Sequence, residues 1–291
     1  QMAVVDYQAP QSIEDAIGIL QKTDIKSKVM AGGTDLIIQT KSQTADPVRV
    51  VDLKHIDGMM SYTLDDGGMS LGPAMSCAEF TTLDDVKAVY PGLSESAYLI
   101  GSTQVQGRAS LGGNLCNASP AADTIPALIA NGAQCVIEGN NGERVVAVED
   151  FVTGVAQNCM ASDELLKQIT IPRPAPGSSD AYLRFIPRTE MDIAVAGAGV
   201  SVTLDSSGKC TAARVAIGAV AVTALLVREA AEALIGTAVD EQALDAAAAA
   251  ASAAAKPITD RRGTAEYRTH VVGVLVKRAA KIAAERARGV K

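Results

Sequence analysis

The chain has 291 residues, of which 48% are hydrophobic and 20% charged, so it can bury sizeable cores, and its length favours two packed domains over one. A net charge of -7, with acidic and basic residues intermixed, argues against a nucleic-acid surface. No run of about 18 apolar residues occurs and the N-terminus lacks the basic-then-apolar order of a signal peptide, so we expect no membrane span and a cytoplasmic location.

The first predicted unit spans residues 1–55 and alternates strands with helices. Apolar residues recur at helical spacing over 12–20, where Ser12 is the expected N-cap. A short strand over 28–31 runs directly into a glycine turn and a second helix, and another strand follows at 49–53. Strand-helix-strand order predicts parallel pairing, so this unit is expected to be a small α/β lobe.

The second predicted unit, residues 56–176, mixes helices with strands. Helices are expected at 77–89 and 123–132, and strands at 62–72 (a hairpin), 134–138, 145–148 and 165–171. Pro172, Pro174, Pro176 and Gly177 then interrupt regular structure, so this stretch is the expected linker.

The third predicted unit, residues 177–291, has strands first and helices afterwards. Strands are expected at 182–186, 194–204 and 211–219, and helices throughout the remainder. The alanine-rich run 246–255 is read as a helix that ends before Pro257, because alanine is the best helix former. The fold class is therefore predicted to be α+β.

Cysteine and histidine content limits the chemistry. Five cysteines are spaced far apart without a CxxC pair, which predicts reduced thiols and no disulfide, zinc or iron–sulfur site. Two histidines, His55 and His270, leave little material for a hydrolytic triad, and we assign no catalytic or metal-binding residue. With 3% aromatic residues, a flat ligand would be held mainly by backbone and aliphatic surface.

Two glycine-rich turns are the candidates for a ligand site. Gly32-Gly33, between a strand and a helix, lets the backbone adopt positive φ and brings N–H groups close to a ligand, which suits a pyrophosphate. The stretch 110–114, Ser-Leu-Gly-Gly-Asn, repeats the device with hydroxyl and amide groups added. A strand-to-helix turn often carries Gly-Gly for steric reasons alone, so a single turn would fit either interpretation equally well. Two turns together predict one extended ligand.

Other nucleotide-binding patterns are missing from the sequence. Neither turn matches GxGxxG and no P-loop Gly-Lys-Ser/Thr occurs, which disfavours a Rossmann dehydrogenase and a nucleotide triphosphatase. Asp123 begins the predicted helix after the second turn, where it either caps the helix or accepts a hydrogen bond from a ligand hydroxyl.

At these residues the chain resembles a known family. Its motifs Ala31-Gly32-Gly33-Thr34-Asp35-Leu36 and Leu111-Gly112-Gly113-Asn114 look like the paired FAD motifs in the flavoprotein (medium) subunits of molybdenum hydroxylases. This family includes xanthine dehydrogenases and aerobic carbon monoxide dehydrogenases. The resemblance extends over essentially the whole chain through Tyr7-Gln8-Ala9-Pro10, Ser119-Pro120-Ala121-Ala122-Asp123, Glu190-Met191-Asp192-Ile193-Ala194 and Glu266-Tyr267-Arg268.

The resemblance implies a fold and a set of contacts. The fold would be a two-lobed FAD-binding domain, with lobes 1–55 and 56–176, followed by a C-terminal α+β domain over 177–291 with a three-stranded antiparallel sheet and helices. The positions that match the family's FAD contacts are Val29, Met30, Ala31, Gly32, Gly33, Thr34, Asp35, Leu36, Ile100, Thr103, Ser110, Leu111, Gly112, Gly113, Asn114, Asp123, Leu166, Arg184 and Ile193.

Two of these positions have alternative interpretations. Arg184 stands where many relatives carry Lys; it keeps the positive charge that stabilises a reduced flavin but differs in shape, and it could instead be a surface strand residue. Ile193 is either a gate over the flavin or ordinary core packing.

The resemblance also implies a heteromeric enzyme, arranged as a dimer of heterotrimers. A large subunit would hold molybdopterin and the substrate, and a small subunit two [2Fe-2S] clusters. This chain would hold FAD without a covalent bond and pass electrons from the clusters to an external acceptor.

The alternative is an independent FAD-dependent oxidase or dehydrogenase of the two-lobed fold. A flavin-free scaffold subunit would be favoured only if the turns lacked their glycines. Some aerobic carbon monoxide dehydrogenases carry Ala-Gly-Gly-His-Ser at the first turn, so CO is a less favoured substrate here, and an N-heterocycle, a purine or an aldehyde remains open.

Overall fold

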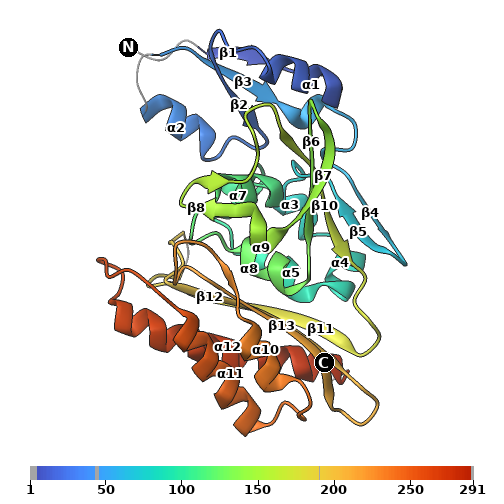
Figure 1. Ribbon diagram of the computed structural model, residues 1–291, viewed down its shortest axis with the longest axis vertical. Coiled ribbons are helices and arrows are strands. Elements are labelled where there is room, and N and C mark those ends of the chain that lie inside the picture. Colours follow the sequence, from blue (N-terminus) through green and yellow to red (C-terminus); the bar gives the residue numbers. More distant parts are fainter. Residues whose placement is uncertain (1–4, 43–45, 190, 290–291) are drawn as a thin grey trace.

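Three main sheets lie one above another along the long axis of this computed structural model, which describes residues 5–42, 46–189 and 191–289 (Figure 1). Glu190, part of one motif above, lies outside the described residues. Within the described residues, no helix is both long and apolar enough to cross a membrane.

Lobe 1, coloured blue in Figure 1, is the predicted α/β unit. Its parallel sheet has the order β1-β3-β2, so β3 is central and β2 is an edge strand. Ser12 Oγ accepts a hydrogen bond from the Asp15 N–H at 3.0 Å and caps α1, as predicted. The elements are β1 (Val5–Gln8), α1 (Ile13–Leu20), β2 (Lys26–Met30), α2 (Leu36–Ser42) and β3 (Val48–Asp52), followed by the 3₁₀ turn η1 (Leu53–His55).

Lobe 2 is built on an antiparallel sheet of order β4-β5-β10-β6-β7. Its strands are β4 (Tyr62–Asp65), β5 (Gly68–Leu71), β6 (Gln134–Gly139), β7 (Gly142–Ala147) and β10 (Leu165–Pro172), with the small hairpin β8 (Val152–Gly154) and β9 (Gln157–Asn158). Its helices are α3 (Cys77–Phe80), α4 (Asp84–Val89), α5 (Pro91–Tyr98), α6 (Thr103–Gln106), α7 (Leu111–Asn117), α8 (Thr124–Ala130) and α9 (Val148–Phe151).

The helix predicted over 77–89 is divided into α3 and α4. Thr81 Oγ1 donates to the Cys77 carbonyl at 2.8 Å and Thr82 Oγ1 donates to the Glu79 carbonyl at 2.7 Å. Threonine hydroxyls that bond nearby carbonyls compete with regular helix hydrogen bonds. The chain therefore turns here before α4 begins.

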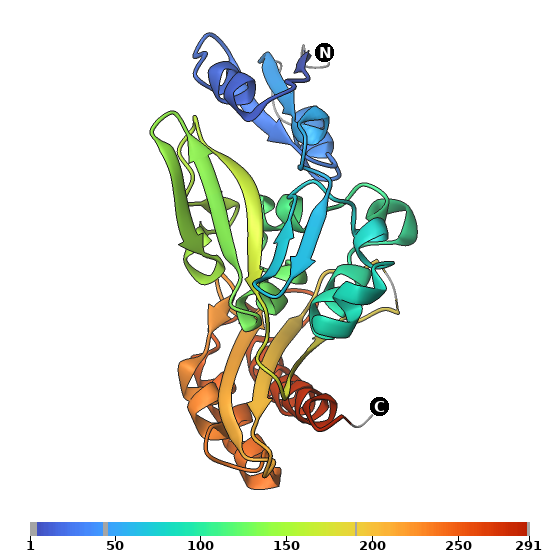
Figure 2. The same cartoon turned by 90° about the vertical axis from the view of Figure 1, so that its right-hand side faces the viewer.

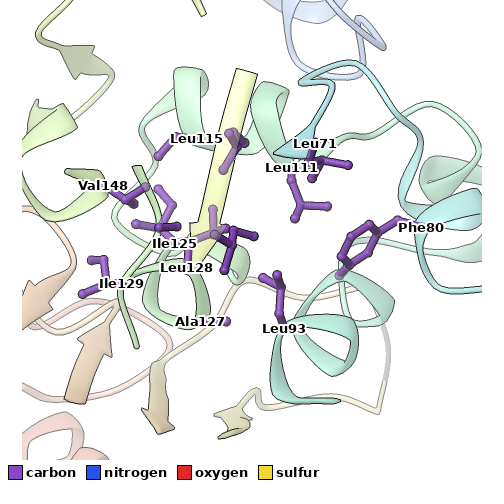
Figure 3. Close-up of a cluster of buried hydrophobic side chains, with 14 of the residues drawn as sticks. Leu71, Phe80, Leu93, Leu111, Leu115, Ile125, Ala127, Leu128, Ile129 and Val148 are labelled. Carbon is purple, nitrogen blue, oxygen red and sulfur yellow. The ribbon is translucent and has the colours of Figure 1, made fainter. Parts of the chain in front are cut away.

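The core of lobe 2 fixes α7 and α8 against the sheet. Figure 3 shows Leu111 and Leu115 of α7 beside Ile125 and Leu128 of α8, with Leu71 of β5 nearby. All five side chains are buried. The helix that follows the second glycine turn is thus anchored by its apolar face.

The C-terminal domain packs its sheet between two layers of helices (Figures 1 and 2). The three predicted strands are present, and two-residue β14 extends the sheet by pairing with β13. α10 and α12 cover one face of this sheet, and α8 of lobe 2 covers the other. The packing of α8 is close: a Cβ at Gly199 of β12 would lie 2.6 Å from the Pro126 carbonyl oxygen. The elements are β11 (Ser178–Phe185), β12 (Ala196–Leu204), β13 (Cys210–Gly218), β14 (Leu225–Leu226), α10 (Arg228–Leu234), α11 (Glu241–Ala254) and α12 (Ala265–Ala287).

Candidate functional site

A cavity of about 750 Å³ lies where lobe 1, lobe 2 and the C-terminal domain meet. This volume is within the range typical of small-molecule and cofactor sites. The cavity brings together the residues predicted to contact FAD, except Thr103 and Leu111. Thr103 is exposed on α6, and Leu111 points into the core of lobe 2 (Figure 3).

The first glycine pair forms an open backbone turn on the lobe 1 wall. Gly33 has φ +76°, as expected for a glycine turn, whereas Gly32 is required for a different reason. A Cβ at Gly32 would lie 1.7 Å from the Arg108 carbonyl oxygen, so glycine lets lobe 1 approach lobe 2. Over the described parts of the chain, the N–H groups of Gly32, Gly33 and Thr34 have no protein acceptor. They are free to bond a ligand oxygen.

The second glycine pair does not repeat this backbone. Ser110 Oγ accepts a hydrogen bond from the Gly113 N–H at 3.0 Å and caps α7, so both glycines lie in the first turn of a helix without positive φ. A Cβ at Gly112 would lie 2.4 Å from Pro73, while one at Gly113 would lie 3.9 Å from the Ala31 Cβ. The expected turn is therefore a capped helix start, in which close packing against Pro73 explains the glycine at position 112.

Asp123 neither caps α8 nor points freely into the cavity. Its carboxylate accepts hydrogen bonds from the Tyr182 hydroxyl at 2.8 Å and from Arg184 Nη1 at 2.7 Å. Burial raises the pKa of Asp123, although Arg184 and Tyr182 both act to lower it. Asn114 Oδ1 instead bonds the first residue of α8, because it accepts from the Thr124 backbone N–H at 3.4 Å and from Thr124 Oγ1 at 2.6 Å.

Arg184 is a buried member of this cluster and not a surface strand residue. Its side chain is 7% exposed, and it lines the cavity from β11 of the C-terminal domain. A guanidinium here places a positive charge at the cavity wall, and Asp123 holds its orientation. Lys in the same place could make only a point-charge contact.

Two aliphatic side chains from different domains also line the cavity. Leu166 of β10 is buried, and Ile193 lines the cavity from the segment before β12 with half of its surface exposed. Ordinary core packing is therefore excluded for Ile193. Asp192 anchors this segment, because its carboxylate accepts from the Ile193 N–H at 2.8 Å and from Arg262 Nε at 3.4 Å.

Some lining residues were not predicted. The segment after β9 carries no motif. Lys28 and Gln39 lie beside the first turn without a recognisable sequence pattern. Burial lowers the pKa of Lys28, and the nearby charge of Lys26 lowers it further. Only their proximity to the glycine motif could have suggested Lys28 and Gln39. The further polar and sulfur-bearing lining residues include Ser27, Cys116, Asn117, Ser119, Asn158, Met160, Ser162, Glu164, Met191 and Asp192.

Of the cysteines and histidines, only Cys116 lies on the described cavity wall, where burial raises the pKa of its thiol to about 12. Among the described residues, no group of three or more His, Cys, Asp or Glu side chains is arranged to hold a metal ion. All five cysteines are free. The described cavity wall includes neither His55 nor His270.

The walls fit FAD. The free N–H groups of the first turn suit phosphate oxygens, the buried Arg184 suits an electron-rich ring edge, and Leu166 with Ile193 suits a flat apolar face.

Similarity to known proteins extends along nearly the whole chain. Residues 3–174 match the FAD binding domain in molybdopterin dehydrogenase, and residues 180–283 match the CO dehydrogenase flavoprotein C-terminal domain. The carbon monoxide dehydrogenase medium chain of Afipia carboxidovorans is 36% identical over 284 residues, which cover 97% of this chain and 98% of the relative. The 6-hydroxypseudooxynicotine dehydrogenase complex subunit alpha of Paenarthrobacter nicotinovorans is 30% identical, covering 98% of this chain and 96% of the relative.

The fold is also similar to that of an enzyme of known structure, again over nearly the whole chain. Reconstituted CO dehydrogenase from Oligotropha carboxidovorans gives a TM-score of 0.93 at 34% identity, covering 98% of this chain and 99% of that chain. The two-lobed arrangement and the C-terminal domain expected from the sequence are confirmed. This chain belongs to the FAD-binding medium subunits of the molybdenum hydroxylase family and is an oxidoreductase subunit with an FAD-binding domain.

Proposed function

We propose that this chain holds one FAD without a covalent bond in the cavity between its three walls and works as an electron relay. Electrons would arrive from [2Fe-2S] clusters of a small partner subunit and leave to an external acceptor. A large partner subunit would hold molybdopterin and transform the organic substrate. The assembly would be a dimer of heterotrimers in the cytoplasm; the five free thiols are consistent with a reducing compartment.

The observation that carries this proposal is that one cavity presents both backbone N–H donors and aliphatic side chains. Gly32, Gly33 and Thr34 offer N–H donors from lobe 1, while Leu166 of lobe 2 and Ile193 of the C-terminal domain offer aliphatic surface. FAD, when bound, supplies the redox chemistry, because its ring system accepts and releases electrons. The protein contributes binding, orientation and a charged group.

Arg184 is the residue that would tune this chemistry. Its guanidinium is buried at the cavity wall, held by Asp123 and, through Asp123, by the Tyr182 hydroxyl. A fixed positive charge in a site of low dielectric favours the anionic form of a bound redox group. Ile193, half exposed and lining the same cavity, would limit the access of water to the bound group.

The proposal leaves the organic substrate to the partner. Relatives at 36% and 30% identity are named for carbon monoxide and for 6-hydroxypseudooxynicotine, so overall similarity to this chain does not identify the substrate. Thr34 and Asp35, where some aerobic carbon monoxide dehydrogenases carry His-Ser, are the one local difference that makes CO the less favoured substrate. The names "medium chain" and "complex subunit" of these relatives support a heteromeric assembly.

An anaerobic reduction experiment separates the relay from an independent oxidase. The isolated chain is loaded with FAD and mixed with dithionite, or with purines, aldehydes and N-heterocycles. Dithionite should bleach the flavin spectrum, and the organic compounds should leave it unchanged until the molybdopterin and cluster subunits are added. Bleaching of the lone chain by an organic compound would support the independent oxidase instead.

A further inference from the structure

A buried ion pair lies directly behind the first glycine turn. Lys54 Nζ donates to Asp52 Oδ1 at 2.6 Å and also to the Ala31 carbonyl oxygen at 2.6 Å. The side chains are 17% and 5% exposed for Lys54 and Asp52. Lys54 is not among the described lining residues, whereas Ala31 and Gly32 are. The lysine thus touches the turn from its protected side.

Asp52 holds the lysine in this position. Its Oδ1 accepts from the Lys54 backbone N–H at 3.0 Å, and its Oδ2 accepts from the Tyr7 hydroxyl at 2.7 Å. Burial alone would raise the pKa of Asp52, but the hydrogen bonds from Lys54 and Tyr7 outweigh it and lower the pKa. Asp52 therefore remains ionised at neutral pH and keeps its partner in place.

The contact with Ala31 determines the direction of the next N–H group. In a trans peptide the C=O and N–H point to opposite sides, and the described chain contains no cis peptide bond. When Lys54 holds the Ala31 carbonyl, the Gly32 N–H must point away from Lys54. That N–H has no acceptor within the described residues.

We propose that Lys54 is a positioning residue for FAD binding, which orients the Ala31–Gly32 peptide through the Ala31 carbonyl. Asp52 holds the lysine, and the Tyr7 hydroxyl in turn holds Asp52. Resting on the function proposed above, this role adds a residue that does not touch the ligand. Glycine makes the turn accessible but also flexible, so the turn needs an external constraint. Lys54 supplies that constraint from the first lobe itself.

The test compares FAD affinity in lysine variants of the flavin-free chain. Lys54→Met keeps the aliphatic stem but loses the hydrogen bond, and FAD affinity should fall about 10-fold to 100-fold, the range for a hydrogen bond to a charged group. Lys54→Arg should restore part of the affinity. Lys277→Met is the matched control, because Lys277 pairs with Glu241 and Asp245 on α11, and it should bind FAD as the wild type does.

A double variant guards against simple misfolding. Lys54→Met leaves Asp52 buried without its cation, whereas Asp52→Asn with Lys54→Met removes the pair together. The double variant should fold and still bind FAD weakly, because the Ala31 carbonyl remains unheld. If it binds FAD as tightly as the wild type, the positioning role is wrong.

Amide exchange gives a readout that does not depend on the flavin. The Ile37 N–H donates to the Gly33 carbonyl at 3.0 Å and the Gln39 N–H donates to the Asp35 carbonyl at 2.9 Å. Both amides should exchange faster in the flavin-free double variant, while those of β12 stay unchanged. Unaltered exchange at Ile37 and Gln39 would overturn the inference. A wild-type chain that binds no FAD would instead contradict the proposed function.

Discussion

The two glycine pairs that line the cavity have the same sequence but different backbones. Gly32-Gly33 forms an open turn with positive φ at its second residue, whereas Gly112-Gly113 begins the capped helix α7. In each pair the first glycine meets neighbouring backbone: Gly32 meets Arg108 and Gly112 meets Pro73. The second glycine of each pair meets only side-chain atoms, at 3.0 Å or more from its Cβ position.

The comparison teaches that one dipeptide meets several physical requirements. Among these four glycines, only Gly33 has the positive φ that favours glycine. Gly32 and Gly112 are glycine because two chain segments approach too closely for a Cβ. At Gly113 the only tight neighbour of a Cβ would be Ser110 Oγ at 3.0 Å, so its place at the cavity wall explains the glycine best. Substitution of each glycine should therefore fail in a different way.

The largest effect is expected at Gly32. In Gly32→Ala the new Cβ would lie 1.7 Å from a backbone oxygen, so the lobes must separate, at a cost of about 3 kcal/mol of unfolding free energy. FAD binding should be lost as well. Gly18→Ala is the control, because nothing lies within 4 Å of its Cβ position in α1. Denaturant unfolding of the flavin-free chain measures both; equal stability of the two variants would contradict the packing interpretation.

A smaller effect is expected at Gly33. Its φ of +76° is strained for alanine, and the nearest atoms are the flexible ends of Ile37 and Met30. Gly33→Ala should lower the unfolding free energy by about 1–2 kcal/mol, and Gly33→Asn by less, because asparagine tolerates this region better. If Ala and Asn had the same effect, the loss would arise from side-chain contacts and not from the backbone.

Gly113 should separate binding from stability. Its helical backbone accepts alanine, so the gain in helix propensity and the close approach to Ser110 Oγ, 3.0 Å from the new Cβ, should leave stability within about 1 kcal/mol. FAD affinity should nevertheless fall, because the methyl group would lie at the cavity. Titration of flavin-free Gly113→Ala with FAD checks this, and wild-type affinity would remove Gly113 from the site.

The smallest expected effect is a dependence of the unfolding free energy on pH, and it arises from the residues behind the first turn only. The pKa of Asp52 is lowered from its ordinary value of 3.8, so its stabilising contribution is present above that value and is lost as pH falls through the lower folded-state pKa. The second turn depends on the neutral Ser110 cap and has no such dependence. Denaturant unfolding between about pH 5 and pH 3 should show a smaller loss of stability in Asp52→Asn than in the wild type. Parallel pH profiles would contradict the assignment.

Local signals predicted the elements well, and tertiary partners explain the differences. The Ser12 cap, the parallel lobe and the three long C-terminal strands follow from spacing and turn residues. The pairing of Asp123 with Arg184 joins two domains, so no local pattern could reveal it. The start of α7 depends on the Ser110 cap, and the sequence pattern alone does not distinguish a capping hydroxyl from one that bonds a ligand.

Acid precipitation of the flavin-loaded chain tests the central claim most directly. The walls of the cavity offer backbone donors, aliphatic surface and Arg184, and the described wall includes neither His55 nor His270. We therefore predict that about one FAD per chain is released into the supernatant and that the pellet is colourless. A pellet that stays yellow, or a chain that takes up no FAD, would contradict the account.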